Sequence, residues 1–130
     1  MAKKFVVGYH IIIDFLVENI TYISDKKYVK KKLEEIINES GLNALGKFVY
    51  KFKKGKRKKP GGVTACYPLK ESHLTIHTWP EDNYGAADIF VCANEKPISE
   101  AKKRAEKALD LLIEKFGVVK YEIKKFERGY

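Results

Sequence analysis

The sequence predicts an α+β fold, a two-layer sandwich in which a mainly antiparallel sheet carries two helices packed on one face. Two segments repeat their apolar residues with helical spacing, and six further segments have the composition of strands. The length of 130 residues suits one compact domain that can bury an ordinary core without disulfides or metals. We therefore expect residues 1–130 to form a single domain.

The first helix is indicated by apolar residues with helical spacing, at Val29, Leu33, Ile36 and Ile37. Ser24 or Asp25 is available to cap its start, and Gly41 to end it. The second helix has a longer apolar stripe, made of Ala101, Ala105, Ala108, Leu109, Leu112 and Phe116. We expect Ser99 to be its N-cap and Gly117 to follow its end. Both helices are amphipathic, so each should pack on an apolar surface.

The remaining apolar segments have strand character, at residues 5–17, 44–52, 62–69, 73–78, 86–92 and 118–126. We expect Trp79, Phe5, Phe15 and Phe48 to lie mostly in the core, with one or two of them beside a bound substrate. Cys66 is expected to be a small buried apolar residue. The segment 53–62 is basic and contains glycine and proline, which predicts a mobile, solvated loop.

The formal net charge of +9 is concentrated in one segment. Between Lys51 and Lys59 there are seven basic residues and no acid, and the rest of the chain carries only +2. This distribution indicates one local basic patch rather than a basic fold, so we do not expect a nucleic-acid partner. The two cysteines, Cys66 and Cys92, have no paired spacing of the zinc or redox kind, so we expect reduced thiols.

The N-terminal segment does not have the pattern of a signal peptide. His10 and Asp14 interrupt its apolar run, and no small-residue cleavage site follows. No other stretch is long enough to span a bilayer. We expect a soluble, cytoplasmic protein without a membrane partner.

The segment 61–94 concentrates the chemistry, because it holds both cysteines, the only tryptophan and two of the three histidines. Its run ESHLTIHTWPE, residues 71–81, followed by ADIFVC, residues 87–92, resembles the signature of the prokaryotic, pyruvoyl-dependent S-adenosylmethionine decarboxylase proenzymes. The resemblance continues in GYHIIIDF, residues 8–15, and GVT, residues 62–64, and so extends over nearly the whole chain.

The resemblance implies autocatalytic cleavage between Glu71 and Ser72, which gives fragments 1–71 and 72–130. Ser72 becomes a covalent pyruvoyl group, the cofactor of the decarboxylation. His77 serves the processing reaction, and Cys92 donates the proton in catalysis. By the same resemblance the mature enzyme is a homodimer or a larger assembly, with residues of both protomers lining the active site.

The resemblance assigns two further positions. Glu81 would hold the ribose hydroxyls of the small-molecule substrate. Thr64 stands where relatives often have a serine that assists processing. The implied activity is decarboxylation of S-adenosylmethionine for polyamine (spermidine) biosynthesis.

The residue types suit this chemistry. An amino-acid decarboxylase needs an electron sink that no ordinary side chain supplies, and a pyruvoyl ketone, which forms a Schiff base with the substrate amine, is one. The Ser72 hydroxyl can attack the carbonyl carbon of Glu71 in a strained turn. A histidine can accept a proton near neutral pH, which suits His77. A thiol that keeps its proton suits Cys92 as a donor.

Alternatives stay open at this level. A pyruvoyl-dependent arginine decarboxylase has the same family pattern, and two departures bear on the substrate: Asp14 replaces a longer acid, and Ala93 replaces the usual glycine. A nucleic-acid-binding module would use the patch 51–59. A degenerate partner that activates a paralogue is disfavoured because the key residues are present.

The histidines do not predict a metal site. His73 and His77 share a strand face, but no third ligand has a useful spacing, so we expect no metal. His10 is expected to be a hydrogen-bonded strand residue.

Overall fold

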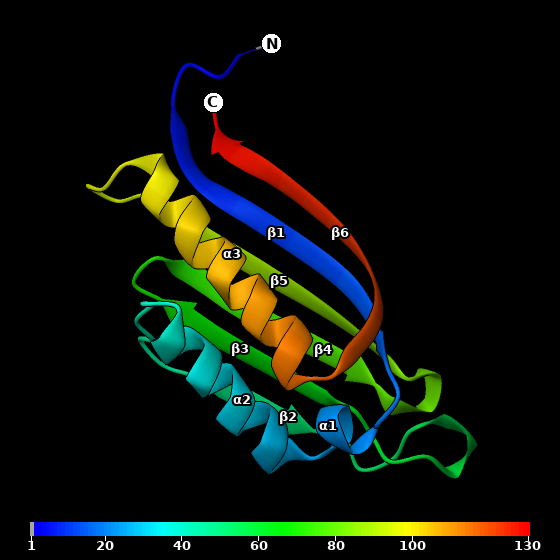
Figure 1. The fold of residues 1–130 in the computed structure, drawn as a ribbon. Helices are drawn as coiled ribbons and strands as arrows, with labels where there is room; N and C mark the ends of the chain where they lie inside the picture. Colours follow the sequence, from blue (N-terminus) through cyan, green and yellow to red (C-terminus); the bar gives the residue numbers. More distant parts are fainter. Residues whose placement is uncertain (1) are drawn as a thin grey trace.

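Six strands form one antiparallel sheet in the computed structural model, which describes residues 2–130 (Figure 1). The sheet order is β2-β3-β4-β5-β1-β6, and every neighbouring pair is antiparallel. The strands are β1 (Val6–Val17), β2 (Phe48–Lys51), β3 (Val63–Leu69), β4 (Ser72–Trp79), β5 (Tyr84–Cys92) and β6 (Val118–Gly129). The helices are α1 (Thr21–Ser24), α2 (Lys26–Glu39) and α3 (Ile98–Lys115). Two 3-10 turns lie at Lys56–Lys58 and Pro80–Asp82.

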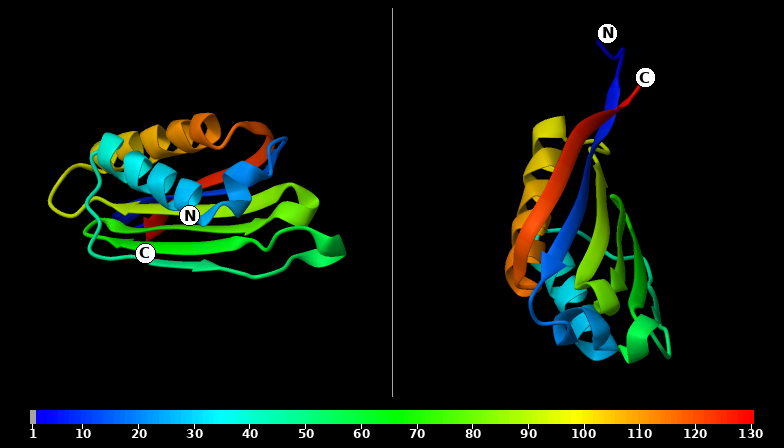
Figure 2. Two further views of the ribbon diagram at one scale, coloured as in Figure 1. Left: turned by 90° about the horizontal axis from the view of Figure 1, so that it is seen from below. Right: turned by 90° about the vertical axis from the view of Figure 1, so that its right-hand side faces the viewer.

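The helices α2 and α3 cover one face of the sheet, and the described helices leave the other face free (Figures 1 and 2). The predicted α+β sandwich is therefore confirmed. Side chains alternate across the sheet, so that in β5 Ala87, Ile89 and Val91 are buried beneath the helices. The core lies between the two layers, and burial of each large apolar side chain there contributes about 1.5–3 kcal/mol.

The expected ends of α2 are confirmed. The Asp25 carboxylate accepts hydrogen bonds from the backbone N–H groups of Lys27 and Tyr28, which satisfies donors that have no partner inside the helix. Gly41 follows the C-terminus with φ of 74°, a left-handed conformation that glycine adopts without a steric penalty.

The predicted N-cap of α3 is wrong. The helix begins at Ile98, so Ser99 lies inside its first turn and Pro97 occupies the cap position. Proline has no N–H and a fixed φ, and it commonly marks the start of a helix. The end is as expected, because Gly117 adopts φ of 62° just past the helix.

The strand expected at residues 44–52 is shorter than predicted and begins at Phe48. The residues before it pair with the turn that joins β3 to β4 instead. Asn43 O accepts a hydrogen bond from Lys70 N–H, and Leu45 N–H donates to Pro68 O, each at 2.8 Å. This segment therefore braces the turn.

Three of the aromatic residues expected in the core are exposed. Phe15 is buried as predicted, but Phe5, Phe48 and Trp79 are 56%, 59% and 41% exposed. Phe48 and Trp79 alternate with helix-facing residues and so point to the helix-free side, which we call the open face. Cys66 also lies there and is only partly buried. Other large exposed residues of the open face are Leu16, Tyr50 and Phe126.

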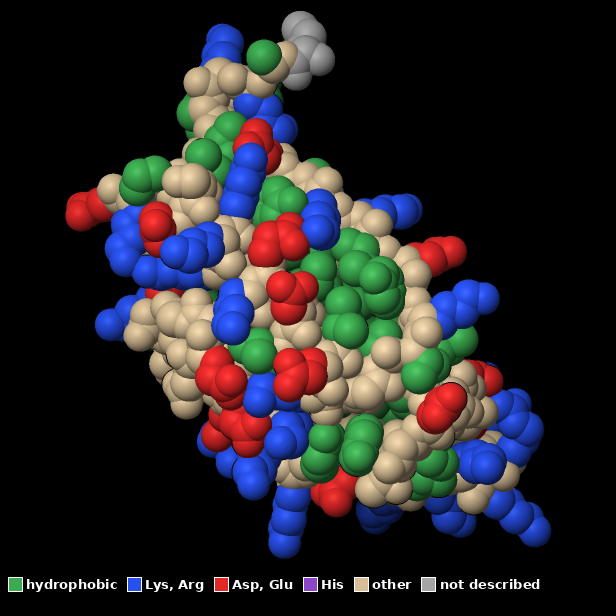
Figure 3. All heavy atoms as spheres, viewed as in Figure 1, with side chains coloured by type: hydrophobic (Ala, Val, Ile, Leu, Met, Phe, Trp, Pro, Cys, Tyr) green, Lys and Arg blue, Asp and Glu red, His purple; other side chains and the backbone are tan. Residues whose placement is uncertain are grey.

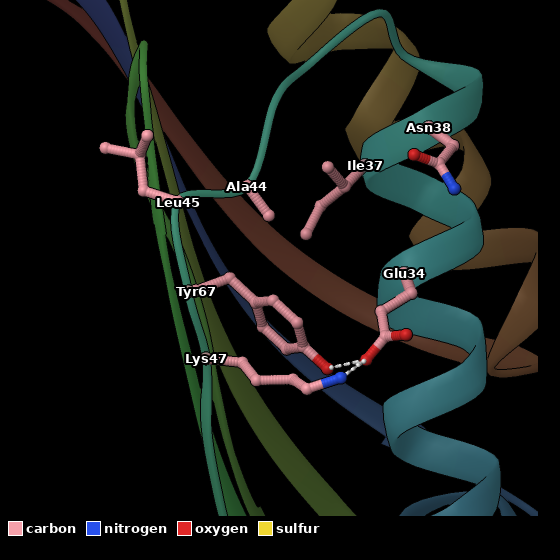
Figure 4. Close-up of a pocket in the computed structure, with 8 residues that line it drawn as sticks. Glu34, Ile37, Asn38, Ala44, Leu45, Lys47 and Tyr67 are labelled. Carbon is pink, nitrogen blue, oxygen red and sulfur yellow. Dashed lines mark hydrogen bonds and ion pairs between the residues drawn. The ribbon is translucent and has the colours of Figure 1, made fainter.

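A polar contact joins α2 to the sheet. The hydroxyl of buried Tyr67 donates to Glu34 Oε2 at 2.8 Å, and Lys47 Nζ lies 3.2 Å from the same oxygen (Figure 4). Burial and this hydrogen bond raise the pKa of Tyr67. A cavity of about 360 Å³ beside these residues contains none of the predicted site residues.

The basic loop after β2 folds against the turn that follows β4. Arg57 Nη2 lies 2.9 Å from both Asp82 Oδ1 and the carbonyl oxygen of Glu81. Lys and Arg side chains project from this end of the molecule in Figure 3. Within residues 2–130, none of the helices has both the length and the apolar character of a membrane span.

Candidate active site

The bond expected to be cleaved lies in a two-residue turn. Leu69 at the end of β3 pairs with Ser72 at the start of β4, so Lys70 and Glu71 form the turn between them. Ser72 has φ of 134°, whereas the other described non-glycine residues with positive φ lie between 53° and 58°. A conformation of this kind costs about 1–3 kcal/mol and persists only where surrounding contacts hold it.

The carbonyl group of Glu71 has a backbone donor. The N–H of Cys92 donates to Glu71 O at 2.6 Å. The contact follows from the strand register, because Ser72 pairs with Val91 and the next residue of β5 reaches the turn. A donor at this position would stabilise negative charge on the oxygen if the carbonyl carbon were attacked.

The thiol of Cys92 lies on the open face and donates to Asn94 Oδ1 at 3.0 Å. An amide oxygen only accepts, so the thiol is the donor in this contact. A cavity of about 550 Å³ adjoins it, and Glu71 and Arg104 contribute to the lining. The Cys92 thiol therefore lies in the same cavity as the residue that precedes Ser72.

A second pair of site residues lies elsewhere on the sheet. Thr64 and His77 are opposite each other in the β3–β4 pairing, and Thr64 Oγ1 lies 3.1 Å from His77 Nδ1. Both side chains belong to the open face. His77 is five residues from Ser72 along β4, roughly 16 Å at the usual rise of a strand. In a single chain, therefore, this pair does not reach the bond at Ser72.

Glu81 lies with the second pair of residues. Its Oε2 accepts the N–H of Lys56 at 2.9 Å. It shares a cavity of about 430 Å³ with Thr64, His77 and Trp79. The predicted site residues thus form two groups in one chain, Glu71, Ser72 and Cys92 at one end of β4, and Thr64, His77 and Glu81 toward the other.

Comparison with known proteins identifies the family. A family model described as S-adenosylmethionine decarboxylase matches residues 9–129. The chain belongs to the S-adenosylmethionine decarboxylase family. Among its relatives, an S-adenosylmethionine decarboxylase proenzyme of Archaeoglobus fulgidus is 32% identical over 124 residues, which are 95% of this chain and 99% of the relative. One of Prochlorococcus marinus (strain MIT 9313) is 30% identical over 122 residues, 94% of this chain and 87% of the relative.

The fold agrees with this family. The crystal structure of the adenosylmethionine decarboxylase from Aquifex aeolicus superposes with a TM-score of 0.81 at 26% sequence identity. The match covers 99% of this chain and 94% of that one. The resemblance found in the sequence is confirmed at the level of the family and of the fold.

Sequence reasoning missed one polar cluster in this S-adenosylmethionine decarboxylase family member. Asp88 on β5 contacts His10 Nε2 on β1 and lies 3.2 Å from His73 Nε2 on β4. Arg128 Nη1 lies 3.4 Å from His10 Nδ1. A guanidinium only donates, so Nδ1 accepts and Nε2 carries the proton that is donated to Asp88. His10 is thus hydrogen-bonded as expected.

The three side chains could in principle surround a cation, because their ligand atoms lie within 4.8 Å of one another. The positive guanidinium of Arg128, 3.4 Å from His10 Nδ1, favours a hydrogen-bonded network over a bound cation. His10 and Asp88 are far apart in the sequence and come close only because β1 and β5 pair in the sheet. Their spacing in the sequence therefore did not indicate the cluster.

Asp14 has a partner on the open face. It accepts a hydrogen bond from the Tyr84 hydroxyl, and this bond, with partial burial, raises the pKa of Tyr84 to about 12. The Tyr84 ring stacks on Trp79 with 5.2 Å between centroids. The shorter acid at position 14 is therefore engaged by a neighbouring strand.

Proposed function

We propose that this chain cleaves itself between Glu71 and Ser72 and then decarboxylates S-adenosylmethionine with a pyruvoyl group made from Ser72. Membership of the family supports the substrate and the reaction. The observation that carries the self-cleavage is the backbone at Ser72, with φ of 134° beside a carbonyl that Cys92 N–H holds at 2.6 Å. The product would supply aminopropyl groups for polyamine synthesis, including spermidine.

The first step is an isomerisation of the backbone. The Ser72 hydroxyl attacks the carbonyl carbon of Glu71, a C–O bond forms, the C–N bond breaks, and the hydroxyl proton passes to the released amine. The N–H of Cys92 stabilises the oxyanion that develops. Strain at Ser72 raises the energy of the starting amide and so lowers the barrier to the ester.

The second step removes the α-proton of Ser72. The Cβ–Oγ bond breaks, and the main-chain carboxylate at the new C-terminus of Glu71 leaves. The dehydroalanine that remains at position 72 is hydrolysed to a pyruvoyl group and ammonia. His77 is the proposed base, and Thr64 orients its ring through the contact of 3.1 Å. This base must come close to Ser72, which it does not do within one chain.

We therefore propose a homodimer in which each protomer supplies Thr64 and His77 to the Ser72 of the other. Both groups of site residues include side chains on the open face, which no helix among the described residues covers. The exposed aromatic residues Phe48, Tyr50 and Trp79 suit burial against another protein surface. A second copy fits because the site is incomplete without it.

After cleavage, the residues around Ser72 fit the group. The pyruvoyl carbonyl supplies the electron sink that decarboxylation needs. Cys92 holds a proton on its sulfur, and Asn94 orients it through the thiol hydrogen bond. Glu81 is proposed to accept the ribose hydroxyls, since a carboxylate can accept at both oxygens and Lys56 engages only Oε2.

The test combines mass and activity. Purified protein should show fragments 1–71 and 72–130 by intact mass, with the loss of ammonia on the second fragment. It should release labelled carbon dioxide from carboxyl-labelled S-adenosylmethionine. The Ser72→Ala variant should remain one full-length species without activity.

Two results would count against the proposal. Equal release of carbon dioxide by wild type and Ser72→Ala would remove the pyruvoyl mechanism. Release from labelled arginine, with none from S-adenosylmethionine, would assign the substrate to the arginine decarboxylase alternative.

A further inference from the structure

The side chain of Glu71 is unusual for a turn residue. Turn carboxylates normally face water, but Glu71 is only 4% exposed. A charged group is buried at this level only where partners compensate for the lost hydration. The side-chain carboxylate of Glu71 must therefore have partners that compensate for its burial.

Two residues from separate elements hold the carboxylate. The segment after α2 supplies Asn43, whose backbone N–H donates to Oε1 at 3.0 Å and whose Nδ2 donates to Oε2 at 2.7 Å. The helix α3 supplies Arg104, whose Nη1 lies 3.6 Å from Oε2. Both carboxylate oxygens are thus engaged, and the turn is tied to α3 and to the segment that follows α2.

The backbone of the turn is held at the same place. Asn43 O accepts the N–H of Lys70 at 2.8 Å. On the other side, Cys92 N–H holds the carbonyl of Glu71. The peptide bond before Ser72 is therefore fixed from two directions, by Asn43 and Arg104 through the side chain and by β5 through the carbonyl.

This arrangement explains how φ of 134° at Ser72 can persist. An unfavourable conformation relaxes unless its neighbours are fixed on both sides. The pairing of Ser72 with Val91 fixes the residue on its C-terminal side, and the anchored Glu71 carboxylate fixes it on its N-terminal side. Release of the carboxylate would let the turn rotate and the strain disperse.

We propose that Asn43 and Arg104 are positioning residues for self-cleavage, which act through the carboxylate of Glu71. The inference rests on the proposed function, because it concerns the same bond. The anchor favours the first step, the attack of the Ser72 hydroxyl on the Glu71 carbonyl. It does not take part in proton removal by His77.

The test measures the cleavage rate of newly made protein by intact mass over time. Glu71→Gln is the main variant, because it keeps the shape but presents an amide N–H₂ to donors of Asn43 and Arg104. Cleavage should slow about tenfold, as expected for a barrier raised by about 1.4 kcal/mol. Arg104→Ala should act in the same direction, and Arg104→Lys should recover part of the rate.

A matched control lies on the same helix. Lys102 pairs with Glu127 at 2.6 Å and lies away from Glu71, so Lys102→Ala should cleave at the wild-type rate. The melting temperature of each uncut variant is measured in parallel. A loss of cleavage rate in Glu71→Gln and Arg104→Ala that is smaller in Arg104→Lys and absent in Lys102→Ala, at similar melting temperatures, supports positioning over general stability.

Hydroxylamine separates the two steps, since it cleaves esters but not ordinary amides. His77→Ala should accumulate the ester and release fragment 1–71 when hydroxylamine is added. Glu71→Gln should stay in the amide form, with little release.

Each outcome bears on a different claim. Rapid release from Glu71→Gln, or cleavage at the wild-type rate in both Glu71→Gln and Arg104→Ala, would overturn the anchor while leaving the proposed function intact. Wild-type protein that never cleaves would overturn both.

Discussion

Cys92 contributes to the candidate site through two different groups. Its backbone N–H holds the carbonyl of Glu71, and its thiol donates to Asn94 on the open face. The first contact serves the proposed self-cleavage, and the second places the proton for turnover. A change of the side chain alone should therefore separate the two activities.

Cys92→Ala keeps the N–H and removes the thiol. We expect cleavage to proceed and decarboxylation to fall by about 10²–10⁴-fold, the usual contribution of a positioned proton donor. Intact mass measures cleavage, and release of labelled carbon dioxide measures turnover. Normal turnover in the cleaved variant would refute the role of the thiol.

The strain at Ser72 can be measured without any chemistry. Glycine adopts φ of 134° more readily than alanine does, because it has no Cβ. In two uncleavable variants, Ser72→Gly should therefore have a free energy of unfolding roughly 1 kcal/mol above that of Ser72→Ala. Urea denaturation gives both values. If Ser72→Ala is the more stable of the two, the backbone is not strained.

The pKa of Tyr84 gives a prediction at high pH. The pKa rises from 10.0 to about 12 in the folded protein, chiefly because the hydroxyl donates to Asp14. The folded state therefore favours the protonated form, and this stabilisation is complete below pH 10 and is lost as the pH rises through about 12.

Burial also raises the pKa values of Tyr9, Tyr28 and Tyr67, so tyrosinate absorbance should show several late-titrating groups. Tyr84→Phe should remove one of them, at about pH 12. Asp14→Asn should move that group toward lower pH. A titration curve that Asp14→Asn leaves unchanged would show that the hydrogen bond is not the cause.

The motif named the candidate site residues, whereas the distances between them come only from the structure. Glu71, Ser72 and Cys92 come together because the β4–β5 register brings Cys92 to the turn, as the motif implies. His77 and Ser72 are far apart because five residues of extended strand separate them. The motif does not show whether a second chain brings another His77 close to Ser72. The burial of Glu71 depends on Asn43, which is distant in the sequence.

At the scale of elements, the two long helices α2 and α3 were predictable, whereas the short helix α1 and several strand ends were not. Periodic apolar residues and the cap at Asp25 locate α2 because these signals are local. The extent of β2 depends on the segment 43–45, which is drawn to the β3–β4 turn by long-range hydrogen bonds. The exposed aromatic residues were misassigned because hydrophobicity does not tell which face of a sheet is covered.

The cap of α2 gives a quantitative prediction. Asp25→Ala removes the acceptor of two backbone N–H groups and should lower the free energy of unfolding by about 1 kcal/mol. Asp25→Asn keeps an acceptor and should change it much less. Urea denaturation in the uncut Ser72→Ala background, at a fixed protein concentration, compares them. Equal losses in the two variants would show that the cap is not the source.

At the scale of the whole molecule, the proposed dimer can be tested by coexpressing two variants that lack different site residues. Ser72→Ala cannot be cut but still offers His77, and His77→Ala retains Ser72 but lacks the base. Expressed together with different tags, they should form mixed dimers in which the His77→Ala chain is cleaved. Expressed alone, each should remain uncut.

The mixture of the two variants shows which chain supplies His77. Cleavage of the His77→Ala chain only in the mixture would place the base in the partner. Failure of the mixture, when copurification proves that mixed dimers form, would require His77 to act within its own chain or not at all.

The sheet order also sets a condition on the timing of the proposed cleavage. A break after Glu71 puts β1 in one piece and its two neighbours, β5 and β6, in the other, while β3 stays beside β4 across the break. Strand β1 of the first piece thus lies between two strands of the second piece. It can form its hydrogen bonds on both sides only when β5 and β6 are both present. The proposed cleavage would therefore have to follow completion of the sheet, and a chain that had been cut and unfolded would have to reassemble from two separate molecules.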